Sequence, residues 1–234
     1  MKIKSLKNKQ IINWNKLKQK KYRDQEGLFL IEGKHLIEEA RKAGYLVSTI
    51  GLSSSCDFEV TEDILKKLSS QPKPPEEIGI CKKIDEKAIA GNIILLDDIQ
   101  DPGNLGTIIR SAVAFHIDTI ILSPNSVDLY NEKVLRASEG MIFNLNIIRK
   151  DLIECITQIK QEGYSVYATT VNGTTSIDKK EKVAIIIGNE GNGIKKEILE
   201  LCDGNITIPM DKKCESLNAG VSASIVMYML DVEK

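Results

Sequence analysis

Short apolar runs rich in Ile and Val recur through the last two thirds of the chain. They constrain the fold more than any other feature of the sequence. The runs lie at Ile93–Leu96, Thr119–Leu122, Leu145–Ile148, Val166–Thr169 and Val183–Ile187, with a candidate sixth at Asn205–Ile208. Helical patterns lie at Leu105–Phe115, Asn131–Arg136, Leu152–Lys160, Gly193–Leu201 and Ala219–Leu230. Strands that are apolar on both faces and alternate with helices indicate an α/β fold, a parallel sheet with helices on both sides.

The first 88 residues predict a separate and smaller α/β unit. Its apolar runs and helical patterns lie at Leu28–Ile31, Leu46–Leu52 and Gly79–Cys81, and at Lys34–Ala43 and Glu62–Leu68. Gly44 is placed to end the first of these helices. The proline-rich segment 71–75 is expected to be a loop, because proline fits neither a helix interior nor a central strand. We therefore expect two domains, residues 1–88 and 89–234.

The formal net charge of −1 conceals two parts of opposite sign. Residues 1–90 hold 18 Lys and Arg against 13 Asp and Glu, whereas residues 91–234 hold 14 against 20. Nine of the basic residues lie in the first 25 positions, where Ile11, Trp14 and Leu17 have near-helical spacing. Phosphate neutralisation drives sequence-independent binding to nucleic acid. The basic end therefore fits a polyanionic partner, and a solvated lysine-rich helix fits the same charges equally well.

Composition excludes several other classes of protein. Hydrophobic residues make up 42% of the chain, which is enough for a core. No apolar run approaches the roughly 20 residues that span a bilayer, and no apolar stretch follows the basic amino terminus as a secretory signal requires. Five widely spaced cysteines without a C-x-x-C pair argue against a disulfide framework or a zinc site. We expect a cytoplasmic protein with no membrane partner and no metal.

Three loops that follow predicted strands carry most of the chemically informative residues. Ligands of such sheets bind outside the carboxyl ends of the strands. The first loop, Asp97–Arg110, suits a helix start with Asn104 as its cap. Arg110 lies six residues further along and is expected to project near this loop. An ordinary capped helix with a surface arginine fits the same pattern.

The second and third loops are rich in Gly, Ser and Asn. Segment 188–193 has the spacing G-x-x-G-x-G, which matches neither the P-loop nor the dinucleotide-binding fingerprint. Glu190 has the wrong charge for a phosphate cradle and suits a cationic or hydroxyl-bearing ligand, although a purely structural turn explains the glycines as well. In the third loop, Ser216 and Asn218 precede an apolar helix and are good helix caps.

Taken in order, the three loops resemble the motifs of the SpoU-type (TrmH-type) branch of the SPOUT methyltransferases. The matching residues are Asn104-x-Gly106-x-x-x-Arg110, Gly188-Asn-Glu-Gly-x-Gly193, and Ile208-Pro-Met followed by Ser216-Leu-Asn218. The amino-terminal part resembles the substrate-binding domain often fused to this catalytic domain, through Lys20-Lys-Tyr-Arg23, Phe29 and Glu32-Gly33. One departure is His116, which ends the first motif helix where the family usually has glycine.

The resemblance implies a fold and an activity. The expected fold is a SPOUT domain with a deep trefoil knot, preceded by a small L30e-like RNA-binding domain. The expected activity is transfer of a methyl group from S-adenosylmethionine to a ribose 2′-hydroxyl of RNA, by a homodimer that pairs through its catalytic domain. Main-chain groups near Gly188, Ile208, Met210 and Leu217, with Thr169 or Thr170, are implied to bind the cofactor.

The implied catalytic residues are Arg110, Asn104, Glu190, Ser216 and Asn218. Because an arginine with a pKa above about 12 is a poor proton acceptor, we expect Arg110 to grip the adjacent phosphate and stabilise the developing alkoxide. Asn104, Ser216 and Asn218 would orient the ribose, and Glu190 would fix Arg110 or the target nucleotide. Lys20, Lys21 and Arg23 are expected to contact RNA.

Three functions stay open on the sequence. The first is methylation of ribosomal RNA, with the large subunit as the expected substrate. The second is the same reaction on transfer RNA. The third is a catalytically silent RNA-binding protein that has kept the fold, against which the five intact catalytic residues argue. A nucleotide-phosphate enzyme is disfavoured because no phosphate-binding lysine directly follows the glycine loop.

Overall fold

The structure is a computed structural model that describes residues 1–175 and 182–232. Its chain divides into two compact units, the first formed by Met1–Asp85 with Asp128–Asn144 and the second by Glu86–Val127 with Leu145–Lys234. The units differ from the predicted domains 1–88 and 89–234 mainly in segment 128–144, which belongs with the first unit although it follows two strands of the second. The predicted domain boundary itself stays a prediction.

The first unit is a five-stranded mixed sheet with helices. Its elements are β1 Lys2–Ile3, α1 Lys9–Lys16, α2 Lys20–Glu26, β2 Leu28–Glu32, α3 Lys34–Lys42, β3 Leu46–Gly51, β4 Phe58–Val60, α4 Glu62–Leu68, β5 Glu77–Lys82, α6 Glu132–Ala137 and the 3₁₀ helix η1 Met141–Asn144. The strand order is β1-β4-β3-β5-β2, and β5 runs antiparallel to both of its neighbours. The expected Gly44 lies just beyond α3 with a φ of 78°.

The second unit is built on a six-stranded sheet in which every pairing is parallel. Its elements are β6 Ile93–Leu96, α5 Pro102–Ala114, β7 Thr119–Leu122, β8 Asn146–Arg149, α7 Leu152–Gln161, β9 Ser165–Thr174, β10 Val183–Ile187, α8 Lys196–Leu199, β11 Gly204–Ile206 and α9 Ala219–Val232. The strand order is β11-β9-β10-β6-β7-β8. The predicted α/β fold with a parallel sheet is therefore confirmed, and the knot stays a prediction.

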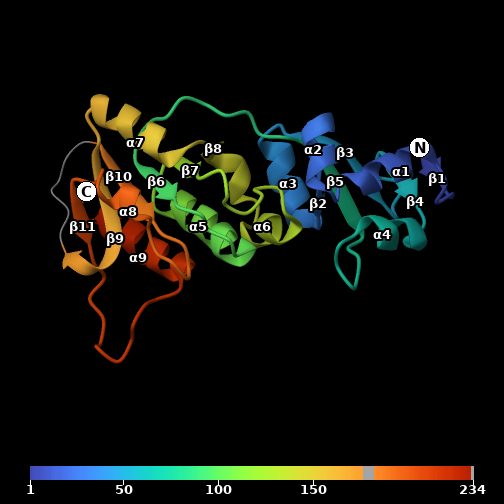
Figure 1. Ribbon diagram of the computed structural model, residues 1–234. Coiled ribbons are helices and arrows are strands. Elements are labelled where there is room, and N and C mark those ends of the chain that lie inside the picture. The colour runs from blue at the N-terminus through green and yellow to red at the C-terminus, as the bar shows by residue number, and fades with distance from the viewer. Residues whose placement is uncertain (176–181, 233–234) are drawn as a thin grey trace. The chain divides into compact units, whose positions relative to one another are not determined.

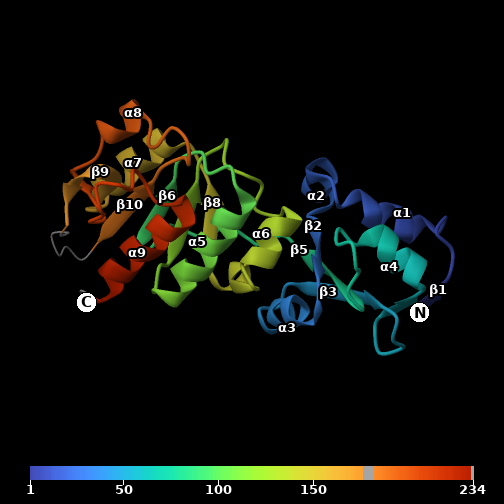
Figure 2. The same ribbon diagram turned by 90° about the horizontal axis from the view of Figure 1, so that it is seen from below.

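Helices cover both faces of this sheet. On one face, Ile156 and Ile159 of α7 and Ile198 of α8 pack with alternate strand residues such as Ile93 and Leu95. On the other face α5 and α9 pack against each other, as Figures 1 and 2 show. Because successive residues of a strand point to opposite faces, strands that are apolar throughout are needed to serve both helix layers. Within the described residues, no helix combines the length and apolar character needed to cross a membrane.

The start of α5 differs from the sequence prediction. The helix begins at Pro102, and Asp101 is its cap, accepting a hydrogen bond of 2.8 Å from the main-chain N–H of Asn104. Proline at the first helical position has no N–H to satisfy, and a preceding aspartate caps well. Asn104 is thus inside the first turn rather than at the cap. Its side chain is free to bond elsewhere.

Candidate active site

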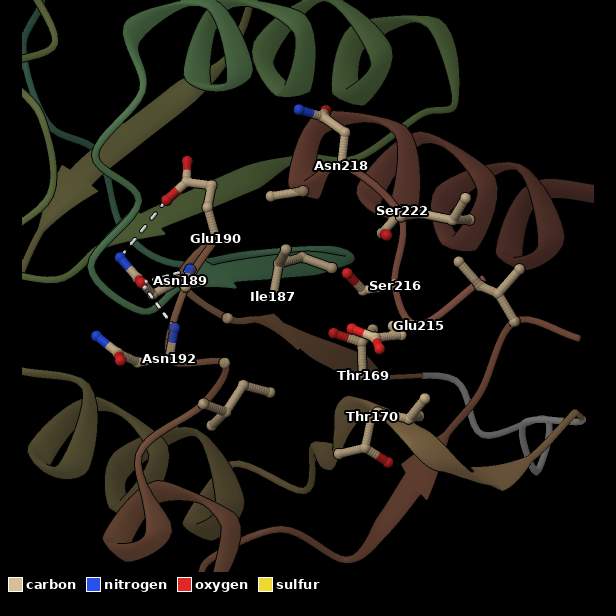
Figure 3. A pocket seen from close by; sticks show the side chains of 18 of the residues that line it. Thr169, Thr170, Ile187, Asn189, Glu190, Asn192, Glu215, Ser216, Asn218 and Ser222 are labelled. Carbon is tan, nitrogen blue, oxygen red and sulfur yellow. Dashed lines mark hydrogen bonds between the residues drawn. The ribbon is translucent and has the colours of Figure 1, made fainter. Parts of the chain in front are cut away.

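The second unit has a cavity where Thr169–Val171 of β9 and the loops after β10 and β11 meet the start of α9. Its volume is about 610 Å³, within the range of small-molecule sites. All six residues expected to bind the cofactor line it: Thr169, Thr170, Gly188, Ile208, Met210 and Leu217. Figure 3 shows Thr169 and Thr170 beside each other on one side of the cavity. It also shows Ile187, the last residue of β10. The structure thus brings these residues together, and their binding of a cofactor stays a prediction.

Three of the five expected catalytic residues, Glu190, Ser216 and Asn218, also line this cavity. Asn104 lies beside it, because its side-chain amide donates a hydrogen bond of 2.9 Å to the Glu190 carboxylate. The start of α9 approaches the same point, since a Cβ added to Gly220 would lie 3.3 Å from Asn104 Oδ1 and 3.2 Å from Asn218 Oδ1. The three loops therefore converge on one place.

Arg110 is placed differently from the other four. It is exposed on α5, two turns beyond Asn104, and it does not line the cavity. No residue within 1–175 and 182–232 is hydrogen-bonded to its guanidinium or forms an ion pair with it, so the expectation that Glu190 fixes Arg110 finds no contact here. Its donors are open to an anion from outside the chain.

The Glu190 carboxylate is held by donors from the first loop. Besides Asn104, it accepts from the main-chain N–H groups of Gln100 and Asp101, each at 3.3 Å. Burial alone would raise the pKa of Glu190, but these hydrogen bonds outweigh it and lower the pKa below its ordinary value. Glu190 is thus a carboxylate at neutral pH and a weak base.

The loop that carries Glu190 is fixed by its own residues. Asn189 and Gly193 exchange main-chain hydrogen bonds of 2.9 and 3.0 Å, and Asn189 Oδ1 accepts from the N–H groups of Gly191 and Asn192. A Cβ on Gly188 would lie 2.5 Å from the main-chain carbon of Gly193. Glycine is therefore required at position 188 because the loop folds back onto it. The structural explanation therefore holds for Gly188, and a role of this glycine in binding a cofactor stays a prediction.

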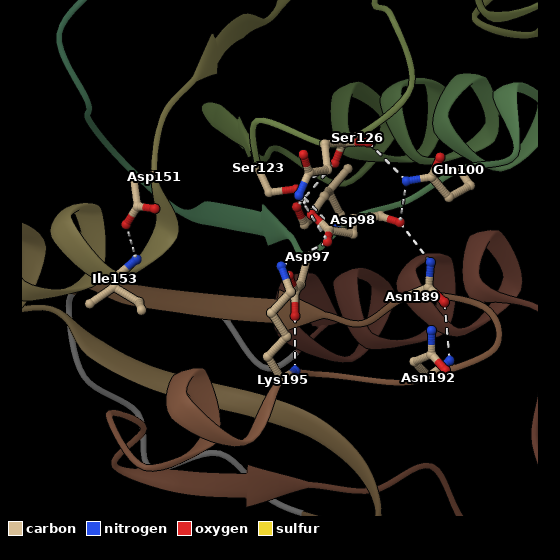
Figure 4. A network of polar contacts seen from close by, with 12 residues as sticks. Asp97, Asp98, Gln100, Ser123, Ser126, Asp151, Ile153, Asn189, Asn192 and Lys195 are labelled. Atoms are coloured by element: carbon tan, nitrogen blue, oxygen red, sulfur yellow. Dashed lines mark hydrogen bonds and ion pairs between the residues drawn. The ribbon is translucent and has the colours of Figure 1, made fainter.

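Ion pairs and hydrogen bonds around Asp97 and Asp98 anchor both ends of this loop (Figure 4). Asp97, only 1% exposed, accepts a 2.9 Å hydrogen bond from the main-chain N–H of Lys195. The Lys195 ammonium lies 3.2 Å from Asp97 and 2.7 Å from Asp98. At the other end, Asn189 Nδ2 donates to the carbonyl of Asp98 at 2.7 Å. The loop after β10 is thus tied to the end of β6.

The third loop presents the side-chain amide of Asn218. Asn218 Oδ1 caps α9 by accepting from the N–H groups of Gly220 at 2.9 Å and Val221 at 3.2 Å, as its predicted capping role requires. No described residue accepts a hydrogen bond from the NH₂ of Asn218, so its donors are open to a ligand. Figure 3 shows Asn218 at the start of α9 and Ser216 further into the cavity, beside Glu215.

The residues expected to contact RNA divide into two kinds. Lys20 and Lys21 are exposed on α2, and Lys20 pairs with Asp24 at 2.9 Å. Arg23 is 7% exposed, and its guanidinium donates to the carbonyls of Leu17 and Lys18 and to the Asp128 carboxylate. This placement favours a structural role for Arg23, which joins α2 to segment 128–144.

Several residues at the site were not predicted as site residues. Asn189, Asp97 and Lys195 fix the loop geometry, and Glu215 lines the cavity. The tendency of Asn to bond its own backbone two residues on could have indicated Asn189. The pairing of Asp97 with Lys195 joins residues 98 positions apart, and a single sequence holds no signal for it.

Comparison with known proteins agrees with this arrangement. The sequence profile described as SpoU rRNA Methylase family matches residues 91–228, and that described as MRM3-like substrate binding domain matches residues 8–57. The 23S rRNA (guanosine(2553)-2'-O)-methyltransferase RlmP of Bacillus subtilis is 37% identical, over 97% of this chain and 98% of its own length.

Solved structures resemble this chain over nearly its whole length. The crystal structure of an RNA 2'-O ribose methyltransferase is 30% identical with a TM-score of 0.82, covering 98% of this chain and 97% of its own. An AdoMet-bound rRNA methyltransferase from Sinorhizobium meliloti is 26% identical with a TM-score of 0.89, covering 100% and 98%. This chain belongs to the SpoU rRNA methylase family.

Proposed function

We propose that this chain transfers a methyl group from S-adenosylmethionine to the 2′-hydroxyl of a ribose in large-subunit ribosomal RNA. The observation that carries the proposal is the convergence of the three loops on one cavity, with Asn104 bonded to Glu190 beside it and Arg110 open to solvent. The family and the 23S rRNA relative from Bacillus subtilis support the same substrate class.

The cavity lining fits this cofactor chemically. Ile187, Ile206 and Leu199 supply apolar walls suited to an adenosine ring. The hydroxyls of Thr169 and Thr170 already donate to the carbonyls of Ile186 at 2.8 Å and Asn172 at 2.6 Å, which leaves their oxygens as acceptors. S-adenosylmethionine carries a sulfonium, an ammonium group and one carboxylate, so its net charge is positive, and it also has ribose hydroxyls. A lining of acceptors and carboxylates suits the net charge and the hydroxyls.

The roles of the chain's own side chains follow from their placement. When bound, the cofactor supplies an electrophilic methyl group. Arg110, whose guanidinium has no partner among the described residues, grips the phosphate next to the target ribose and stabilises the negative charge that develops on the 2′ oxygen. Asn218 donates from its NH₂ group, and with Ser216 it orients the ribose. The proton leaves to phosphate or water, because Glu190 is a weak base and a guanidinium group is a poor proton acceptor.

We also propose that two copies of the chain pair through α5 and α9. Val221 and Tyr228 of α9 are 46% and 53% exposed, and the Tyr228 ring packs edge-on against Phe115 just after α5, 5.7 Å between centroids. Exposed apolar side chains gathered in this way are typical of an interface. Sedimentation velocity should show a dimer, and Tyr228→Lys should shift it toward single chains.

The proposed compartment is the cytoplasm, where five free cysteines stay reduced.

The activity can be tested directly. The protein is incubated with methyl-labelled S-adenosylmethionine and, in parallel, unmodified large-subunit rRNA and unmodified total tRNA, and the labelled nucleotide is then mapped. We expect label on a ribose of the rRNA. Label on tRNA would move the substrate to the second candidate class. Label on a base would overturn the reaction. Cofactor binding without any label would favour the silent RNA-binding protein.

A further inference from the structure

The charged groups of the cavity are of one sign. Among the described residues that line it, only Glu190 and Glu215 carry a formal charge, and no Lys, Arg or His is present. The side-chain hydroxyls of Thr169 and Thr170 are also left as acceptors by their main-chain bonds. Such a lining favours a ligand that carries positive charge.

The two carboxylates are not equivalent. Glu190 is engaged by Asn104 and by the main-chain N–H groups of the first loop. Figure 3 shows its carboxylate turned away from Glu215, which lies next to Ser216 on the segment leading into α9. Glu215 is exposed at the cavity wall, so its charge is available to a bound ligand.

The position of Glu215 selects one of the positive groups of the methyl donor. The methyl group has to face the ribose, which Ser216 and Asn218 orient in the proposed function, and Glu215 directly precedes Ser216. In a bound donor, the sulfur that carries the methyl group would therefore lie at the Glu215 end of the cavity. Transfer of the methyl group turns the charged sulfonium into a neutral thioether, so donor and product differ there by one unit of charge.

We propose that the Glu215 carboxylate makes the cavity prefer the sulfonium of S-adenosylmethionine over the thioether of S-adenosylhomocysteine. Glu215 is thus a specificity-determining residue that retains the donor and eases release of the spent product. This inference rests on the proposed function, because it takes S-adenosylmethionine as the ligand. It concerns binding alone, so calorimetry without RNA can test it.

The test compares the two ligands on the full chain by isothermal titration calorimetry. In Glu215→Gln we expect the Kd for S-adenosylmethionine to rise about fivefold, the size of one solvent-exposed charge interaction, while the Kd for S-adenosylhomocysteine changes by less than about twofold. Glu215→Asp keeps the charge and should keep most of the preference. Glu154→Gln, an exposed change of the same charge on α7, is the matched control and should alter neither Kd.

The outcomes separate the inference from the proposed function. If Glu215→Gln weakens both ligands equally, or weakens neither, Glu215 does not sense the sulfonium and the inference is overturned. If the unaltered protein binds neither ligand, the proposed function fails instead. Thermal melts of each variant establish that it is folded, and Glu215→Ala, which also removes the charge, supplies the comparison if the glutamine variant does not fold.

Discussion

The side-chain amide of Asn104 donates a 2.9 Å hydrogen bond to the carboxylate of Glu190, although 86 positions separate the two residues. The bond joins the first turn of α5 to the loop after β10. It is available because Asp101, not Asn104, caps the helix. The contact therefore depends on both the cap chemistry of one loop and the tight turn of the other.

Asn104→Asp should damage both the fold and the reaction. The change removes the donor and places a second carboxylate beside Glu190, which should raise the pKa of Glu190 through like-charge repulsion. At neutral pH we expect a loss of roughly 1 kcal/mol in the free energy of unfolding, kept small because Glu190 is exposed although Asn104 is buried, and a fall in turnover of about tenfold or more. Urea unfolding and single-turnover methylation measure the two effects.

The loss of stability in Asn104→Asp should depend on pH. Below the raised pKa of the pair, one proton relieves the repulsion, so the stability gap between Asn104→Asp and the unaltered protein should narrow as pH falls from 8 toward 5. Asn13→Asp, exposed in the first unit, is the control and should show no such trend. A gap that stays constant with pH would mean that the two side chains do not interact.

Arg110→Lys should remove most of the turnover and leave cofactor affinity unchanged. Lysine keeps the charge but cannot form the bidentate contact of a guanidinium with phosphate, and Arg110 does not line the cavity. We expect the rate of methyl transfer to fall roughly a hundredfold, with the Kd for S-adenosylmethionine within about twofold of the original. Arg41→Lys, exposed on α3, is the matched control. A variant that retains its rate would exclude the proposed role.

Much of this fold could be predicted because its elements depend on sequence patterns within short segments. The apolar runs gave all six strands of the parallel sheet, and α4 spans Glu62–Leu68 as its spacing predicted. The three loops could also be located from the sequence, because Asn, Gly and Ser near strand ends favour specific turns and helix caps. At His116 the departure from glycine has a visible outcome, because this residue itself takes a left-handed conformation with a φ of 53°.

What could not be predicted depends on contacts between distant residues. The predicted helix Gly193–Leu201 is only Lys196–Leu199 in the structure, because Gly193 bonds back to Asn189 and the N–H of Lys195 bonds to Asp97. The assignment of segment 128–144 to the first unit likewise depends on tertiary packing, such as the contact of Phe29 with Tyr130 at 4.6 Å between ring centroids. No periodicity within either segment signals such partners.

Asp24 should give the first unit a measurable acid sensitivity. Hydrogen bonds with Lys83 and Lys20, both 2.9 Å, lower the pKa of Asp24 to about 2 from its ordinary value of 3.8. A carboxylate whose pKa is lowered by folding stabilises the fold above its ordinary pKa, and this contribution is lost as pH falls from about 4 to about 2. We expect a contribution below about 1 kcal/mol, because the group is exposed.

The measurement uses the single tryptophan of the chain. Trp14 packs against Phe58 in the first unit, 4.9 Å between ring centroids, so its fluorescence reports unfolding there. Asp24→Asn should be less stable than the unaltered protein at pH 6, and the difference should shrink as pH falls below about 4 and approach zero near pH 2. Glu26→Gln, exposed two residues away, should match the unaltered protein throughout. A difference for Asp24→Asn that grows on acidification would contradict the sign.

Removal of the basic side chains of Lys20 and Lys21 on α2 should weaken RNA binding with little effect on stability. Lys20 and Lys21 are exposed, so the double change to alanine should weaken RNA binding and reduce the slope of log K against log salt by about one for each lysine. Stability should fall by less than about 1 kcal/mol, since only the surface pair with Asp24 is lost.

Arg23→Ala should have the opposite effect. It removes one partner of a largely buried ion pair, in which the Arg23 and Asp128 side chains are 8% and 21% exposed, and leaves two carbonyls without their donor. We expect a loss of about 3 kcal/mol in the unfolding free energy of the first unit, and an unchanged salt slope for RNA binding by the protein that remains folded. If Arg23→Ala instead lowered the salt slope with little loss of stability, Arg23 would be an RNA contact after all. Filter binding across a salt series and Trp14 fluorescence in urea together decide between the two roles.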